Sequence, residues 1–245
     1  MNSSQQMLTV SDHNRSFIHM TYVYPVVSRR AGGVSVGINL NPNNACNWHC
    51  AYCQVPGLVR GAAPEIDLAQ LEDELRRFLD ELLHGSFMAD HVPPEAQVIR
   101  DIAFSGNGEP TSHPDFEGII DDTLALRDRH CPTAKVSVLS NATQIHRDDV
   151  RRALLRVDNN ILKLDSAFDA TARLMNNPQS PAYTVRGVVE QMKGFDGRLT
   201  VQTMFLRGEC DGQKTDNTTE EEVSAWLRLI EEIRPRQVMV YSLDR

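Results

Sequence analysis

Three cysteines, Cys46, Cys50 and Cys53, lie within one short stretch, and the aromatic residue Tyr52 stands directly before the last of them. Structural zinc sites favour cysteines separated by two residues and need a fourth ligand, so this is not the usual spacing of a zinc site. Iron–sulfur clusters normally take four thiolates. Three thiolates this close can hold three irons of a cubane cluster and leave the fourth iron free. The spacing therefore predicts an iron–sulfur site with one open coordination position.

A glycine-containing segment follows the predicted strand 98–104 and supplies a carboxylate. It contains Gly106, Asn107, Gly108 and Glu109. Glycine lets the backbone approach a ligand closely, and the carboxylate of Glu109 can accept hydrogen bonds from that ligand. The alternative is an ordinary turn between a strand and a helix. We favour a ligand-binding loop because the carboxyl ends of parallel strands are where such proteins bind their ligands.

Polar side chains also end three later predicted strands. Ser140 and Asn141 follow one strand and can hydrogen-bond a ligand, although Asn141 also suits a left-handed turn position. Lys163 and Asp165 lie two residues apart on the next strand and therefore share a face. A buried charged pair needs a reason, which is either a bound ligand or a structural ion pair. Gln202, on the following strand, is a ligand contact or a satisfied core glutamine.

The elements that must position these residues alternate between strand and helix patterns. This alternation demands parallel strands joined by right-handed crossovers. Six units are too few for a closed eight-stranded barrel, so the prediction is an α/β fold with an open, partial (β/α)6 barrel. The predicted strands are 34–40, 98–104, 135–139, 161–165, 199–206 and 237–243, and the predicted helices are 67–83, 115–129, 147–156, 185–193 and 219–232.

Three segments are predicted to lie outside this alternation. Residues 22–33, interrupted by Pro25 and two glycines, read as an extended lead-in and a turn, and residues 207–212 read as a polar loop. Residues 1–16 are expected to be a disordered tail. Residues 17–245 then form a single domain, which ends abruptly after its last strand, as a chain shortened at its C-terminus would.

The composition limits the class of protein. The chain has 245 residues, a hydrophobic content of 41%, a net charge of −8 and five cysteines. We see neither a long apolar run for a membrane span nor a secretory signal, and crowded thiols suit a reducing compartment, so we expect a cytoplasmic protein without membrane contact. The acidic balance argues against nucleic acid as the main partner.

The cysteine pattern, C-x-x-x-C-x-(aromatic)-C, resembles the signature of radical S-adenosylmethionine (SAM) enzymes. The resemblance implies a partial barrel and a 4Fe-4S cluster held by Cys46, Cys50 and Cys53, with SAM chelated to the free iron. Segment 105–110 is similar to the glycine–glycine–glutamate motif of these enzymes, with one asparagine interrupting the glycines. By this resemblance the following residues would contact SAM: Tyr52 against the adenine, Gly106, Asn107, Gly108 and Glu109, and also Ser140, Asn141, Lys163, Asp165 and Gln202.

The resemblance also implies an activity. A reduced cluster would cleave SAM to a 5′-deoxyadenosyl radical, which abstracts hydrogen from an unknown substrate, with flavodoxin or ferredoxin as the electron donor. We expect a small-molecule substrate, and less readily a tRNA or a protein. The run from Ser105 to Thr111 is similar to wyosine-type tRNA-modifying synthases, but those carry a second cluster on upstream cysteines, and no cysteine precedes Cys46 here.

Two rival functions also fit the cysteine pattern. One is a glycyl-radical activating enzyme, which would apply the same radical chemistry to a protein partner. The second belongs to a different class, a non-catalytic iron–sulfur or zinc module that does not cleave SAM. Cys210 is either a substrate-facing thiol or hydrogen-atom donor, or an incidental cysteine, and Cys131 receives no role.

Overall fold

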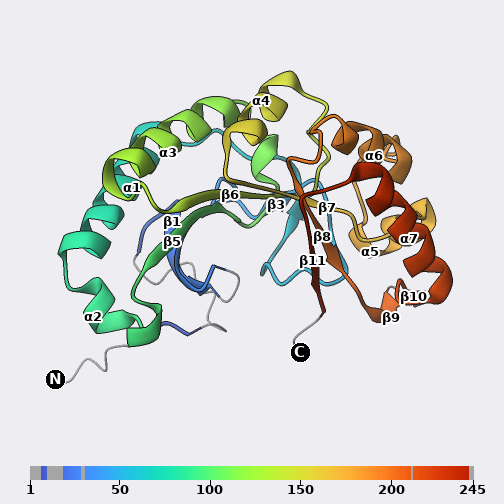
Figure 1. The fold of residues 1–245 in the computed structure, drawn as a ribbon, viewed down its shortest axis with the longest axis horizontal. Coiled ribbons are helices and arrows are strands. Elements are labelled where there is room, and N and C mark those ends of the chain that lie inside the picture. The colour runs from blue at the N-terminus through green and yellow to red at the C-terminus, as the bar shows by residue number, and fades with distance from the viewer. Residues whose placement is uncertain (1–6, 10–18, 29–30, 211, 243–245) are drawn as a thin grey trace.

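The computed structural model describes residues 7–9, 19–28, 31–210 and 212–242, without the side chain of Cys210. A seven-stranded sheet curves through the molecule, and the helices cover its outer side (Figure 1). The strand order is β1-β2-β5-β6-β7-β8-β11; all neighbours from β2 onwards are parallel, and β1 is antiparallel to β2. The sheet does not close on itself. The predicted open, partial α/β barrel with six parallel strands is therefore confirmed.

The strands of this sheet are β1 Val23–Ser28, β2 Gly33–Ile38, β5 Ile99–Phe104, β6 Lys135–Ser140, β7 Asn159–Lys163, β8 Thr200–Met204 and β11 Gln237–Tyr241. The helices are α1 Leu68–His84, α2 Phe87–His91, α3 Phe116–His130, α4 Asp148–Arg156, α5 Asp169–Asn176, α6 Val185–Lys193 and α7 Glu220–Ile233. Two short strand pairs lie outside the sheet, β3 Ala45–Cys46 with β4 Val59–Arg60, and β9 Arg207–Cys210 with β10 Gln213–Asp216; single 3₁₀ turns span Pro94–Ala96 and Pro110–Ser112.

Three segments differ from the prediction. The lead-in is a true strand, β1, because Pro25 is tolerated on an edge strand, where only one side of the backbone is paired. The polar loop after β8 is the β9–β10 hairpin, and α5, which was not predicted, follows β7. Leu8, inside the expected tail, is 1% exposed, and its N–H donates to the carbonyl of His91 at 2.8 Å.

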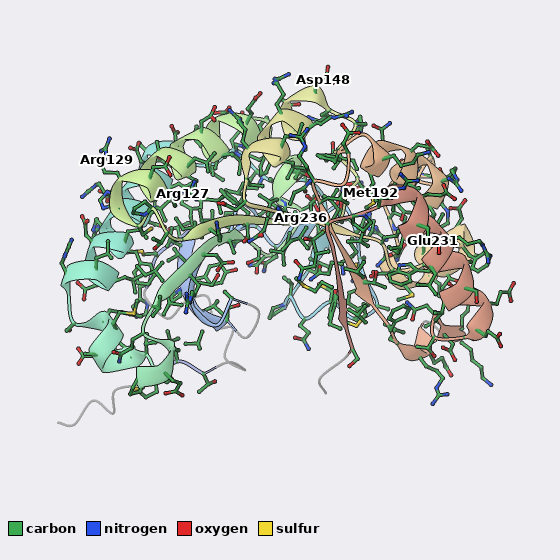
Figure 2. The ribbon with its side chains drawn as sticks, in the orientation of Figure 1. Arg127, Arg129, Asp148, Met192, Glu231 and Arg236 are labelled. Carbon is green, nitrogen blue, oxygen red and sulfur yellow. The ribbon has the colours of Figure 1, made fainter. Side chains whose placement is uncertain are left out.

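The helices form where apolar residues repeat with helical spacing and capping residues mark the ends. The carboxylate of Asp67 accepts a hydrogen bond from the N–H of Gln70 at 3.0 Å and starts α1. The buried face of α1 includes Leu71, Leu75 and Phe78. The opposite faces of the helices carry exposed polar side chains such as Arg129, Asp148 and Glu231, which point away from the sheet (Figure 2). None of the described helices is long and apolar enough to cross a membrane.

Glu74 ties the start of β1 to α1. Its buried carboxylate accepts hydrogen bonds from the backbone N–H groups of Thr21 at 2.9 Å and Tyr22 at 2.8 Å, and from the side chain of Gln70 at 2.8 Å. The interaction compensates for the burial of a charge, because each oxygen has a donor.

Replacing this carboxylate should therefore weaken the fold. We expect Glu74→Ala to lower the free energy of unfolding by about 2–3 kcal/mol, because buried backbone donors lose their acceptor. Glu72→Ala, an exposed position on the same helix, is the matched control and should change stability little. Urea unfolding followed by circular dichroism measures both, and equal stability of the two variants would contradict the role of Glu74.

Candidate cofactor site

The predicted site residues gather where the parallel strands end. The cysteine loop, residues 40–53, follows β2, and the glycine loop, residues 105–110, follows β5. Asn39 joins the two loops, because its side-chain oxygen accepts hydrogen bonds from the N–H of Asn41 at 3.1 Å and from the N–H of Asn107 at 2.8 Å. Asn41 donates from its side chain to the carbonyl of Ala45 at 2.9 Å. The two loops are thus held together before any ligand is considered.

The close contact between the glycine loop and the segment 39–45 requires glycine at positions 106 and 108. A Cβ atom on Gly108 would lie 2.0 Å from the carbonyl oxygen of Ala45, and one on Gly106 would lie 2.2 Å from the side-chain oxygen of Asn39. The close approach that we expected for a ligand is here an approach to the cysteine loop itself. Asn107 donates to the side chain of Asn44 at 2.6 Å, while its own side-chain oxygen is buried and has no partner among the described residues.

Glu109 is a buried brace between strand ends. Its carboxylate accepts hydrogen bonds from the N–H of Thr111 at 3.1 Å, the hydroxyl of Ser140 at 2.8 Å and the N–H of Asn141 at 2.6 Å. Burial raises the pKa of the Glu109 carboxyl, and these hydrogen bonds oppose that rise. The polar groups of Glu109 and Ser140 bind one another in this structure. Their contact with SAM stays a prediction.

Asn47 connects the cysteine loop to the end of β6. Its side-chain oxygen accepts a hydrogen bond from the amide of Asn141 at 2.7 Å, and its amide donates to the hydroxyl of Thr143 at 2.7 Å. Asn141 does not occupy a left-handed position; Ala142 does, with φ of 65°. Asn141 thus lies beside the cysteine loop and fixes it through Asn47, and its contact with SAM stays a prediction.

The C-terminal end of α5 holds the other side of the cysteine loop. The N–H of Ala51 donates to the carbonyl of Met175 at 2.8 Å, and the N–H of His49 donates to the carbonyl of Asn176 at 3.1 Å. These carbonyls have no partner within the helix. Asn177 ends the helix in the left-handed conformation, with φ of 42°. A helix end thereby supplies acceptors that the irregular loop needs.

A cluster of buried polar side chains links Tyr52 to the ends of β7 and β11. The hydroxyl of Tyr52 donates to the carboxylate of Asp165, and the ammonium of Lys163 lies 3.8 Å from the same carboxylate. Lys163 also lies over the rings of Tyr52 and Tyr241, at 5.1 and 5.0 Å from their centres. β7 ends at Lys163, so Asp165 lies just beyond the strand rather than on it. Of the two alternatives, the structure shows the ion pair, and contact of Lys163 and Asp165 with SAM stays a prediction.

Gln202 lies near this cluster without joining it. It pairs in register with Lys163 across β7 and β8, and its amide lies 3.7 Å from the sulfur of Met239. Its contact with SAM stays a prediction. So does the packing of Tyr52 against adenine.

The three cysteines are free thiols, and their environments differ. Cys46 and Cys50 are half-buried, and Cys53 is exposed. Burial raises the pKa of Cys46 to about 12 and that of Cys50 to about 11, although nearby Lys163 favours the thiolate of Cys50. No group of three or more His, Cys, Asp or Glu side chains within the described ranges is placed to hold a metal ion. The role of the three cysteines as cluster ligands stays a prediction.

Comparison with known proteins identifies the family. The sequence model described as Radical SAM superfamily matches residues 40–218, which is most of the chain and includes both loops. This protein therefore belongs to the radical SAM superfamily. Enzymes of this superfamily use a 4Fe-4S cluster and SAM, and they need an electron donor and a substrate.

Three relatives are similar in sequence to this chain. The chain is 26% identical to a protein named GTPase Obg from Brachyspira hyodysenteriae, covering 90% of this chain and 29% of that protein. It is 28% identical to UPF0026 protein slr1464 from Synechocystis, covering 89% and 74%, and 26% identical to UPF0026 protein MJ1312 from Methanocaldococcus jannaschii, covering 87% and 60%. The chain thus spans less than two thirds of two of these relatives.

Two solved structures share the fold. SuiB from Streptococcus suis bound to S-adenosylmethionine has a TM-score of 0.57 at 12% identity, covering 88% of this chain and 42% of SuiB. TYW1 with a lysine–pyruvate adduct bound has a TM-score of 0.59 at 15% identity, covering 86% and 65%. At these identities the likeness concerns the fold alone.

The chemistry of the site fits the cofactors of the family. The cysteine loop supplies three thiols and no fourth cysteine. Two buried acceptors beside it, the side-chain oxygens of Asn107 and Asn176, have no hydrogen-bond partner among the described residues. SAM carries amino and hydroxyl groups that can donate hydrogen bonds to such oxygens. A buried acceptor without a partner is costly, so a donor from a bound ligand would stabilise this site.

The sequence interpretation missed Asn39, Asn47 and Asn176. Short polar side chains near strand ends were the available signal for Asn39 and Asn47. For Asn176 no signal was visible, because it lies more than 120 residues from the cysteine loop and its contacts depend on α5.

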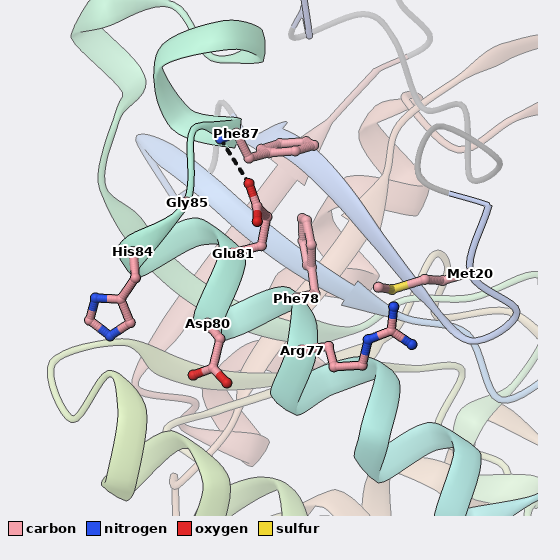
Figure 3. Close-up of a pocket in the computed structure, with 8 residues that line it drawn as sticks. All are labelled: Met20, Arg77, Phe78, Asp80, Glu81, His84, Gly85 and Phe87. Atoms are coloured by element: carbon pink, nitrogen blue, oxygen red, sulfur yellow. Dashed lines mark hydrogen bonds between the residues drawn. The ribbon is translucent and has the colours of Figure 1, made fainter.

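A cavity of about 520 Å³ lies elsewhere, at the end of α1 (Figure 3). Phe78 and Phe87 line it together with the charged side chains of Arg77 and Asp80. The carboxylate of Glu81 accepts a hydrogen bond from the N–H of Phe87 at 3.2 Å beside it. None of the predicted site residues lines this cavity.

The contact between Gly108 and Ala45 generates a prediction. Gly108→Ala should displace the cysteine loop and cost about 1–3 kcal/mol, because a methyl group has no room beside the carbonyl of Ala45. Gly208→Ala is the matched control, since a Cβ atom there meets nothing within 4 Å. Thermal unfolding and the iron content after anaerobic reconstitution measure the effect, and wild-type values for Gly108→Ala would contradict it.

A second prediction concerns His113, which follows the glycine loop. It is 3% exposed, and its Nδ1 accepts a hydrogen bond from the N–H of Asp115 at 3.1 Å. Burial lowers its pKa below the ordinary value near 6.5. The unfolded chain then binds a proton more readily, so this histidine contributes stability that is present above pH ~6.5 and is lost as the pH falls through the lower pKa of the folded state.

His113→Asn tests this linkage, because asparagine keeps an acceptor for Asp115 and cannot be protonated. We expect its stability to fall less than that of the wild type between pH 7.5 and pH 5. Urea titrations at several pH values provide the measurement. Parallel curves for the two proteins would show that His113 carries none of the acid sensitivity.

Proposed function

We propose that this protein cleaves SAM reductively at a 4Fe-4S cluster held by Cys46, Cys50 and Cys53, and uses the 5′-deoxyadenosyl radical to abstract hydrogen from a substrate. One observation supports this proposal most directly. The glycine loop packs against the three-cysteine loop and holds it at the carboxyl edge of the partial barrel. Membership of the radical SAM superfamily supports the cofactors.

The residues around the cysteine loop would have separate roles in this reaction. The cysteines would bind as thiolates, and since burial raises the pKa of Cys46 and Cys50, loading the cluster would release protons. Lys163 lies close enough to favour the thiolate of Cys50. When bound, the cluster supplies the single electron that splits the sulfonium of SAM. Trp48, 2% exposed and packed edge-on against Tyr183 with ring centres 5.7 Å apart, would exclude water from this side of the loop.

SAM would be oriented by the acceptors that remain. Asn107 in the glycine loop offers a buried side-chain oxygen to the amino group. Glu109, Ser140 and Asn141 would act by fixing the loops that surround SAM, since their polar groups already hold one another. Holding the reacting carbon at one place is what lets the radical meet the intended C–H bond.

A wyosine-type synthase is the second candidate, supported by the shared fold of TYW1. The solved TYW1 structure carries a lysine–pyruvate adduct, and a lysine needs a neutral amine to form one. Lys163 does not suit that role. Burial disfavours its ammonium, but Asp165 and Tyr241 outweigh the effect and raise its pKa. We therefore propose Lys163 as a fixed cation. Because the net charge of −8 disfavours a nucleic acid, we propose a small molecule as the substrate, ahead of a tRNA or a protein.

The experiment is anaerobic reconstitution with iron and sulfide, followed by SAM and dithionite. We expect about four irons per chain, a brown protein and release of 5′-deoxyadenosine. Replacing all three loop cysteines by alanine should abolish the colour and the release, whereas Cys131→Ala, a buried cysteine outside the loop, should retain both. A fully loaded cluster without 5′-deoxyadenosine, or zinc in place of iron, would favour a non-catalytic metal module instead.

A further inference from the structure

Asn176 is the residue that brings the polar cluster into contact with a cysteine. It is the last residue of α5 and is 1% exposed. Its side-chain nitrogen lies 2.8 Å from the hydroxyl of Tyr52, 2.7 Å from the carboxylate of Asp165 and 3.7 Å from the sulfur of Cys50. One amide group thus touches the cysteine loop and the strand end at once.

The carboxylate of Asp165 fixes which end of the amide faces the sulfur. A carboxylate accepts hydrogen bonds and cannot donate, so the NH₂ end of Asn176 must point toward it. The other oxygen of Asp165 accepts from the N–H of Met204 at 2.8 Å, which holds the carboxylate in place. The amide has two N–H groups, and the hydroxyl of Tyr52 and the oxygen of Asp165 that they approach bind one another. One N–H group can therefore face both of these oxygens, which leaves the second for the sulfur of Cys50.

The backbone of Asn176 holds the same loop. Its carbonyl accepts the N–H of His49 at 3.1 Å, and the preceding carbonyl, of Met175, accepts the N–H of Ala51 at 2.8 Å. Cys50 lies between these two loop residues. The amide of Asn176 is consequently placed against the sulfur by a helix end that binds the backbone on both sides of Cys50.

We propose that Asn176 is a positioning residue that directs an N–H group at the sulfur of Cys50 and raises the reduction potential of the cluster bound there. This inference rests on the proposed function. Hydrogen bonds to cysteine sulfurs set the potentials of iron–sulfur clusters. A donor withdraws electron density from the sulfur and stabilises the reduced cluster, which carries one more electron than the oxidised one. Because Asp165 places a negative charge nearby, the donor also shields the sulfur from that charge.

The test is the midpoint potential of the reconstituted cluster in Asn176→Leu, which keeps a similar volume and removes the donor. We expect a more negative potential, such that the ratio of reduced to oxidised cluster at a fixed solution potential falls about tenfold, which equals about 59 mV for a one-electron couple. A redox titration followed by electron paramagnetic resonance gives this value without any turnover. Asn176→Ala provides the same comparison if the leucine variant does not fold.

Gln191→Leu is the matched control, because Gln191 is an exposed amide on the next helix, α6. Its potential should equal that of the wild type. Folded, loaded Asn176 variants with a wild-type potential would overturn this inference and leave the proposed function standing. A wild-type protein that takes up no 4Fe-4S cluster would instead overturn the proposed function.

Discussion

The site depends on hydrogen bonds that hold an irregular loop from three directions. The cysteine loop has little regular structure of its own, so its backbone donors and acceptors need partners elsewhere. The glycine loop and the end of β6 bind the side chains of Asn44 and Asn47, and the C-terminal end of α5 accepts the backbone N–H groups of His49 and Ala51. Each partner is itself fixed by the sheet or by a helix, and the position of the three thiols follows from the fold around them.

Two buried carboxylates make this arrangement stable. Glu109 gathers donors from the glycine loop and the end of β6, and Asp165 gathers donors from Tyr52, Asn176 and β8. A buried charge without partners would be strongly unfavourable, so each carboxylate requires the neighbouring segments to stay in place. The polar residues at the strand ends thereby serve as structure first, and they leave only a few acceptors, such as the oxygen of Asn107, for a ligand.

Much of the fold could be predicted from the sequence, because apolar periodicity marks the parallel strands and the longer helices. The cysteines and the strand-end residues also lie together as expected. The edge strand with Pro25 was missed, because the sequence pattern does not show that the backbone of Pro25 is paired on one side only, at the edge of the sheet. The local roles of Gly108 and Glu109 were missed for a related reason. Both contact distant backbone, and spacing along the chain cannot show which groups meet across the sheet.

The partners of the cysteine loop are spread from Asn39 to Gln179, whose N–H donates to the carbonyl of Asn47 at 2.8 Å. Contacts of such long sequence separation form late in folding, since a long loop must close first. During synthesis the cysteines leave the ribosome well before α5 does. More than a hundred further residues must therefore be translated before the loop can be fixed. If the loop binds a cluster as proposed, the metal would reach a settled site only after that stretch is translated.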